Sequence, residues 1–203
     1  MTIHVLVEGG AAVAAPQHAL LGTKSETNGY KHVAILLKAT TIALATPVGV
    51  HHMCPPLRLE DTMPTDVVAW TPLSAEEGSD IDDWIEVLKS EAVTSTYYLV
   101  PAAKTIRDDV TGRVIRRTFS CAGFVAEAYQ AARISLVVPE NQLPPVDRGT
   151  LVGVWGERNV RLGELRYGLV GPPPWRVLLP GFLLRAMNCS RASLPYAPTL
   201  ADV

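Results

Sequence analysis

One cysteine in this chain stands where a nucleophile could be activated. Cys121 begins a segment in which Phe124 and Ala128 recur at the spacing of an apolar helix face. The hydroxyl of Ser120 or Thr118 can cap that helix. The free N–H groups and the macrodipole at a helix start favour the thiolate, which is the nucleophilic form of cysteine. The segment therefore predicts a reactive thiol, provided that a base lies nearby, although most free cysteines are inert packing residues.

A nucleophilic thiol needs a base to accept its proton, and the base needs a third group to orient it. His32 is the best candidate because it begins a continuous apolar run, residues 33–37, which is typical of a buried strand. Such a position holds an imidazole rigidly at the edge of a core. The other histidines are His4, His18, His51 and His52.

Two segments resemble the NlpC/P60 superfamily of papain-like proteins. The run from Phe119 to Val125, Phe-Ser-Cys-Ala-Gly-Phe-Val, followed by Tyr129, resembles the nucleophile motif of that superfamily. The run from Tyr30 to Ile35, Tyr-Lys-His-Val-Ala-Ile, resembles its histidine strand. The histidine precedes the cysteine, which resembles the circularly permuted branch, the YiiX/YaeF-like and lecithin–retinol acyltransferase-like proteins. The resemblance covers about residues 28–135 and implies a cysteine-bearing helix packed on a small antiparallel sheet.

The third group of the expected triad is where the chain departs from this resemblance. Family members usually place a polar residue about twelve positions after the histidine, and this chain has Leu44 there. Leucine cannot accept an imidazole N–H. Thr46 is a weak substitute on the same strand face, and a backbone carbonyl, a water or one of the doublet His51-His52 are the alternatives.

Composition excludes several classes of protein. Hydrophobic residues make up 48% of the 203 residues and charged residues 19%, so the chain can bury a substantial core. A formal net charge of −2 without a basic cluster argues against binding to nucleic acid. No apolar run is long enough for a transmembrane segment, although the apolar stretch 177–184, flanked by arginines, leaves peripheral membrane contact open. Without a convincing signal peptide, we expect a cytoplasmic protein.

A metal site or a cofactor is not expected. His51, His52, Cys54 and Asp61 lie close together in sequence, but they do not form a zinc pattern of four well-spaced ligands. We therefore expect no cofactor, and we expect the two cysteines other than Cys121 to be structural or incidental.

Local patterns predict an α+β fold in a papain-like domain over residues 1–170, with a proline-rich extension over 171–203 packed on it. The strand at 32–37 should form a hairpin with a returning strand at 42–46, which Pro47 ends. The other expected elements are a short helix near 17–21, strands at 67–71 and 151–155, a turn over 108–117 that reverses the chain at 109–112, and the cysteine helix at 120–132. A further helix is expected from Ser79 or Asp80, with a start within 73–77 as the alternative.

These patterns lead to two main functional hypotheses, and the proline-rich tail leaves open a third, a structural or effector module whose surface recruits another protein. The first is a cysteine hydrolase or acyltransferase that cleaves an amide or ester through a Cys121 acyl-enzyme, with His32 as base and Tyr98 and Ser120 at the substrate. The resemblance implies a peptide, another amide or a lipid as substrate. The second is a papain-like binding protein that has lost turnover and holds a small amphipathic or amino-acid-like ligand; Leu44 is its main support.

Overall fold

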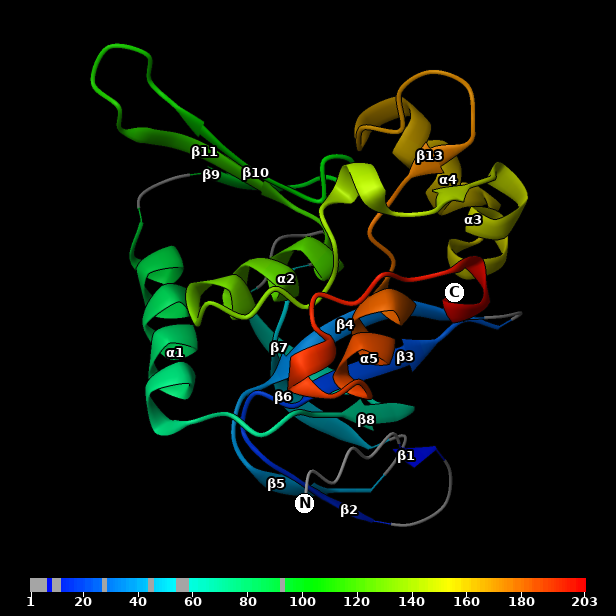
Figure 1. Cartoon of the computed structure of the whole chain (residues 1–203). Coiled ribbons are helices and arrows are strands. Elements are labelled where there is room, and N and C mark those ends of the chain that lie inside the picture. The colour runs from blue at the N-terminus through cyan, green and yellow to red at the C-terminus, as the bar shows by residue number, and fades with distance from the viewer. Residues whose placement is uncertain (1–6, 9–11, 27–28, 44–45, 54–58, 92–93) are drawn as a thin grey trace.

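The chain is an α+β protein whose central element is a six-stranded antiparallel sheet (Figure 1). The computed structural model describes residues 7–8, 12–26, 29–43, 46–53, 59–91 and 94–203. The strands lie in the order β1-β8-β3-β4-β6-β7. Their bounds are β1 Val7–Glu8, β3 Leu20–Lys24, β4 Tyr30–Leu36, β6 Pro47–His51, β7 Glu60–Pro64 and β8 Val67–Ala69.

The two faces of the sheet bury different sets of side chains. Val33 and Ile35 of β4 belong to a large apolar cluster with helices α2 (Cys121–Ala131) and α5 (Pro180–Met187), which cover this face (Figure 1). Ala34 and Leu36 alternate to the other face and join a smaller cluster. That second face is covered by the short pair β2 (Val13–Ala15) and β5 (Thr40–Ile42).

Helix α2 is held at its first turn by a cap and by a close backbone contact. Ser120 is the N-cap, and its hydroxyl accepts the N–H of Gly123 at 2.9 Å. The N–H of Ser120 donates to the carbonyl of Ala102 at 2.7 Å. A Cβ on Gly123 would lie 1.8 Å from that same carbonyl oxygen, so only glycine permits this approach. Of the two possible caps, Ser120 is therefore the one used.

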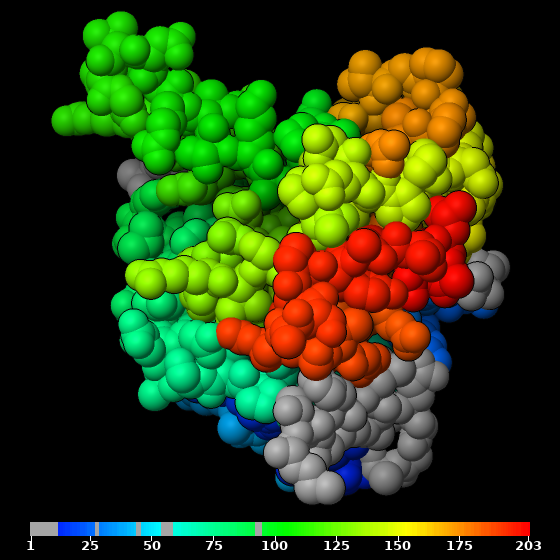
Figure 2. Space-filling model, viewed as in Figure 1, coloured from blue at the N-terminus to red at the C-terminus, as the bar shows by residue number. Residues whose placement is uncertain are grey.

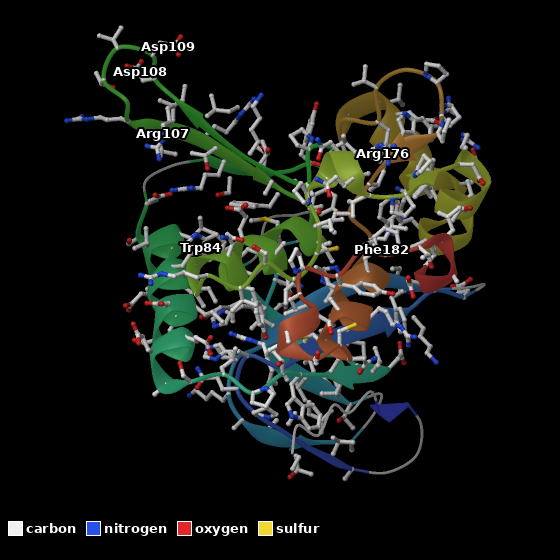
Figure 3. All side chains as sticks on the ribbon, viewed as in Figure 1. Trp84, Arg107, Asp108, Asp109, Arg176 and Phe182 are labelled. Atoms are coloured by element: carbon white, nitrogen blue, oxygen red, sulfur yellow. The ribbon has the colours of Figure 1, made fainter. Side chains whose placement is uncertain are left out.

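Three further strands form an arm that carries the chain into α2. Strands β9 (Thr94–Tyr97), β10 (Ala103–Arg107) and β11 (Val114–Phe119) form a second sheet in the order β10-β11-β9. The reversal predicted at 109–112 is confirmed, but the turn is shorter than 108–117 because residues 114–117 belong to β11. The labelled Asp108 and Asp109 lie at the outer end of this hairpin (Figure 3). Helix α1 (Ala75–Ser90) packs beside α2, with Trp84 against Phe124 at 5.5 Å between ring centroids.

The C-terminal part of the chain completes the core. Helices α3 (Arg148–Trp155) and α4 (Glu157–Arg166) lie beside the start of β4, where the indole N–H of Trp155 donates to the carbonyl of Lys31. Strands β12 (Pro145–Val146) and β13 (Trp175–Arg176) form a small pair, and α5 packs on β3 and β4. Short 3-10 helices lie at Glu140–Gln142, Arg191–Ser193 and Leu200–Asp202.

The predicted hairpin was wrong in its second strand. β5 ends at Ile42 and pairs with β2, not with β4. The strand that returns along β4 is β6, which begins at Pro47 and pairs His51 with Ile35. Proline lacks an N–H but is tolerated at the first position of a strand, so Pro47 starts this strand rather than ending one.

Three other predictions also differ from the structure. The segment near 17–21 enters β3, which pairs with strands on both sides, and the apolar run 151–155 belongs to α3, capped by Asp147. Leu151 and Val154 are its buried residues, at helical rather than strand spacing. Helix α1 starts earlier than Ser79 because Ser74 and Glu77 form a capping box. Among the described residues, no helix is both long and apolar enough to cross a membrane.

The contact at Gly123 predicts a large loss of stability on Gly123→Ala. The added methyl group would collide with the Ala102 carbonyl, and overpacking of this kind costs about 1–3 kcal/mol or more. Gly78 of α1 is the matched control, because the nearest atom to its Cβ is 3.4 Å away on a His18 side chain. Gly78→Ala should be neutral or stabilising by up to about 1 kcal/mol. Urea denaturation of the two variants tests this, and equal stabilities would contradict it.

Candidate functional site

The Cys121 thiol is buried where the first turn of α2 meets β4. Cys121 is the first residue of the helix and is 1% exposed. Its sulfur lies within interaction range of the backbone N–H groups of Val33 and Ala122 and of the side chain of Tyr97, all of which act to lower the pKa of the thiol. The helix therefore delivers the thiol to the residue that follows His32 in the sequence.

An incompletely paired edge of β4 makes this contact available. Among the described residues, β6 pairs with β4 only at Ile35 and Leu36. From Val33 towards Tyr30, β4 keeps its β3 neighbour but no longer has β6 beside it. The backbone of β4 at Val33 can therefore meet the sulfur instead of another strand.

His32 is hydrogen-bonded to a second histidine. Its Nε2 lies 3.0 Å from Nδ1 of His52, and the two rings meet edge to face with centroids 5.2 Å apart. His52 directly follows β6, whose last residue, His51, pairs with Ile35 of β4. The pair therefore forms at the end of β6, where it leaves β4. Because Nε2 is occupied by His52, Nδ1 is the nitrogen of His32 that remains for another partner.

Of the residues predicted to orient the His32 imidazole, the structure brings His52 to it and not Thr46. Thr46 is exposed, and its hydroxyl donates to the carbonyl of Ala43, so it does not contact the imidazole of His32. Leu44 lies outside the described residues. His52, one of the alternatives from the sequence, is the group that meets the far nitrogen.

Neither Ser120 nor Tyr98, the two residues predicted to contact the substrate, has a side chain available for this beside the thiol. Ser120 is 2% exposed, and its hydroxyl is used as the helix cap. Tyr98 lines a cavity on β9–β11, and its ring is close to Gly168. Its neighbour Tyr97 is the tyrosine whose side chain interacts with the sulfur, and it also stacks edge to face on Tyr167 at 5.4 Å between ring centroids. Alternation along β9 could have separated the two tyrosines, had the strand direction been known.

A cavity of about 370 Å³ connects the imidazole with Tyr97. Its wall is mostly apolar and aromatic, and His32 and Lys31 supply its basic groups. The lining residues are Lys31, His32, Tyr97, Leu99, Trp155, Asn159, Leu162 and Tyr167. Tyr97, whose side chain interacts with the Cys121 sulfur, therefore lines the same cavity as His32, although Cys121 itself is not among the lining residues.

Burial keeps both reactive groups neutral at pH 7. Desolvation raises the pKa of the Cys121 thiol to about 11, against hydrogen bonds from backbone groups and Tyr97 that lower it. Desolvation, followed by the positive charges of His52 and Lys31, lowers the pKa of His32 to about 4. The unliganded site therefore holds a thiol and a neutral imidazole rather than an ion pair.

His51, the other histidine of the doublet, has a different environment from His52. His51 faces the start of β7, with Nδ1 3.6 Å from a carboxylate oxygen of Glu60. Desolvation lowers its pKa, and the nearby Lys89 lowers it further. Within the described part of the chain, no group of three or more His, Cys, Asp or Glu side chains could hold a metal ion; Cys54 lies outside that part. Cys121 and Cys189 are free thiols.

Comparisons of the chain with family models, curated proteins and solved structures give no match.

The raised pKa of Cys121 predicts slow alkylation of the unliganded protein. A thiol with a pKa of about 11 has about 100-fold less thiolate at pH 7 than one at the ordinary 9.0, so it should react more slowly with iodoacetamide by at least that factor. Because the pKa is raised, the rate should still be climbing as the pH approaches 11. Peptide mass spectrometry can follow Cys121 and the partly exposed Cys189 in one sample. Equal rates at pH 7 would contradict the prediction.

Proposed function

We propose that the protein is a cysteine-dependent hydrolase or acyltransferase in which Cys121, His32 and His52 act as nucleophile, base and orienting group. The observation that carries the proposal is the 3.0 Å bond between Nε2 of His32 and Nδ1 of His52, formed beside the strand residue that interacts with the thiol. An imidazole held by a partner on one nitrogen, with the other available near a thiol, is the arrangement that nucleophilic catalysis requires.

The order and packing of the elements support a permuted papain-like fold. The histidine strand β4 comes first in the chain, and the cysteine helix α2 comes later and packs on that strand. The resemblance to the NlpC/P60 superfamily places a polar residue on the strand that returns after the histidine strand. In this chain the strand that returns along β4 is β6, and His52, which follows it, would take the role of the polar residue that is missing at Leu44.

The proposed reaction begins with proton transfer from sulfur to His32. In this proposal the His32 proton is on Nε2 and is donated to His52, so that the unprotonated Nδ1 would accept the proton of the thiol. As the sulfur attacks the carbonyl carbon, the S–H proton moves to Nδ1 and the carbonyl oxygen becomes an oxyanion. Collapse breaks the bond to the leaving group, which takes the proton from Nδ1. Water or an amine then attacks the acyl-enzyme, with His32 accepting its proton and returning it to the sulfur.

Two donors near the sulfur can stabilise the oxyanion. The backbone N–H of Cys121 lies at the start of α2, where helix N–H groups have no partner within the helix. The side chain of Tyr97 interacts with the sulfur, so its hydroxyl could donate instead to the oxygen of an incoming carbonyl. The adjacent cavity, with Leu99, Trp155 and Leu162 in its wall, suits an apolar acyl group of an amide or ester.

A binding protein without turnover is the second candidate. The observation that favours it is the near-complete burial of Cys121 with a raised thiol pKa. In that case the cavity beside His32 would hold a small amphipathic ligand without forming an acyl-enzyme.

Cys121→Ala separates the two candidates. Incubation of the wild type with a p-nitrophenyl ester of a short fatty acid should add one acyl group, detected by intact-mass spectrometry, and Cys121→Ala should not be acylated. Cys189→Ala is the control, since Cys189 lies at the end of α5, bonded to the Arg185 carbonyl, and should leave acylation unchanged. Equal acylation of the wild type and Cys121→Ala would remove Cys121 from the mechanism.

The role of His52 predicts a specific loss of turnover. His52→Leu removes the acceptor for the His32 N–H, so ester hydrolysis should fall by about 10²-fold, the lower end of what acid–base catalysis contributes. His52→Gln should recover part of the rate because its amide oxygen can accept the same hydrogen. His51→Leu is the matched control, because His51 faces Glu60. If both leucine variants hydrolyse the ester at the same rate, His52 is not the orienting group.

A further inference from the structure

A second cavity, of about 560 Å³, shares Tyr97 and Tyr167 with the cavity beside His32. It opens between the β9–β11 arm and the α4 region, which stand apart as separate lobes in Figure 2. Its lining residues are Thr96, Tyr97, Tyr98, Val100, Pro101, Lys104, Ile106, Arg116, Thr118, Arg166 and Tyr167. The two tyrosines form the wall that the two cavities share.

Strand register sets one row of polar side chains across the floor of this cavity. Thr118 of β11 pairs with Lys104 of β10 on one side and with Thr96 of β9 on the other. Arg116 lies two residues before Thr118 and therefore on the same face of the sheet. Arg166, the last residue of α4, lines the cavity from outside the sheet.

The cavity is cationic without a counter-charge. Lys104, Arg116 and Arg166 line it, and none of its described lining residues is acidic. Within the described part of the chain, none of the three forms an ion pair. The opposite face of the same sheet differs, because Arg117 there binds Glu91 through both ends of its guanidinium at 2.7 Å.

A buried hydroxyl in the wall of this cavity has no hydrogen-bond partner among the described residues. Thr118 is 5% exposed and lines the cavity, and its Oγ1 has no hydrogen-bond partner in the described part of the chain. A buried polar atom without a partner costs free energy, and nearly all such atoms in proteins are satisfied by protein or by a bound species. Thr118 thus offers a donor next to Lys104, in a cavity whose three cationic side chains form no ion pair with any described residue.

We propose that this cavity binds an anionic group, a carboxylate or phosphate, on the substrate. The anion would accept the hydroxyl hydrogen of Thr118 and pair with Lys104, Arg116 and Arg166. This inference rests on the proposed function in one respect: since Tyr97 borders both cavities and interacts with the thiol, the anion would lie close to the scissile amide or ester. The apolar acyl part would then occupy the cavity beside His32.

Binding to the Cys121→Ala protein tests the proposal without turnover. Isothermal titration with hexanoate, hexyl phosphate and neutral hexanamide should show at least one anion binding roughly 10-fold more tightly than the amide, with affinity falling as salt rises. Which of the two anions binds more tightly distinguishes carboxylate from phosphate. Vesicles of phosphatidylcholine with and without phosphatidylserine show whether the anion can belong to a lipid surface, and binding of the soluble probes alone assigns it to a soluble substrate.

Substitutions of the lining residues test whether the anion binds in this cavity. Arg116→Gln, Lys104→Gln and Arg166→Gln should each weaken the preferred anion by roughly 10-fold and leave hexanamide unchanged. Thr118→Val, which is nearly isosteric, should weaken the anion while preserving the unfolding midpoint. Arg113→Gln, at the exposed turn of the same hairpin, is the charge-matched control and should bind like the parent.

Equal binding of anions and amide, or equal loss in Arg113→Gln, would overturn the anion site. Neither result would bear on acylation of Cys121, and failure of acylation would leave the anion affinities intact. The anion site and the catalytic proposal can therefore fail separately.

Discussion

The contact between the first turn of α2 and the backbone of β4 is the constraint on which the rest of the site depends. It requires Ser120 to cap the helix, the Ala102 carbonyl to hold the N–H of Ser120, and a glycine at position 123 to let that carbonyl approach. Only in this position does the Cys121 sulfur meet the N–H of Val33. Any sideways shift of the helix would separate the thiol from the strand that carries His32.

Burial gives the site its resting state. Desolvation acts in opposite directions on an acid and a base, raising the pKa of Cys121 and lowering that of His32, so both are uncharged at neutral pH. A reaction at this site would have to create its charges together, when the proton passes from sulfur to imidazole. His52 would then stabilise the new imidazolium through the hydrogen bond it already makes, which agrees with a base that works only once substrate is aligned.

Tyr97 and Tyr167 divide the region around the thiol into two environments. On one side the wall is apolar and includes His32; on the other it carries cations and an unpartnered hydroxyl, Thr118. A substrate with an apolar acyl part and an anionic part would place its carbonyl near the dividing wall. The division also explains how one short strand, β9, contributes to both environments, since Tyr97 and Thr96 lie on opposite faces of it.

The sequence by itself determined the elements that carry Cys121 and His32. Their apolar periodicities, one helical and one that of a buried strand, are local properties, and both elements are present at α2 and β4. Tertiary structure alone decided that His52 meets His32, that Tyr97 rather than Tyr98 reaches the sulfur, and that Lys104, Arg116 and Thr118 share a face. These depend on the length of the β4–β6 connection and on strand register, which are set by pairing between distant segments. Local periodicity records only which residues are buried, and does not record which strand lies beside them.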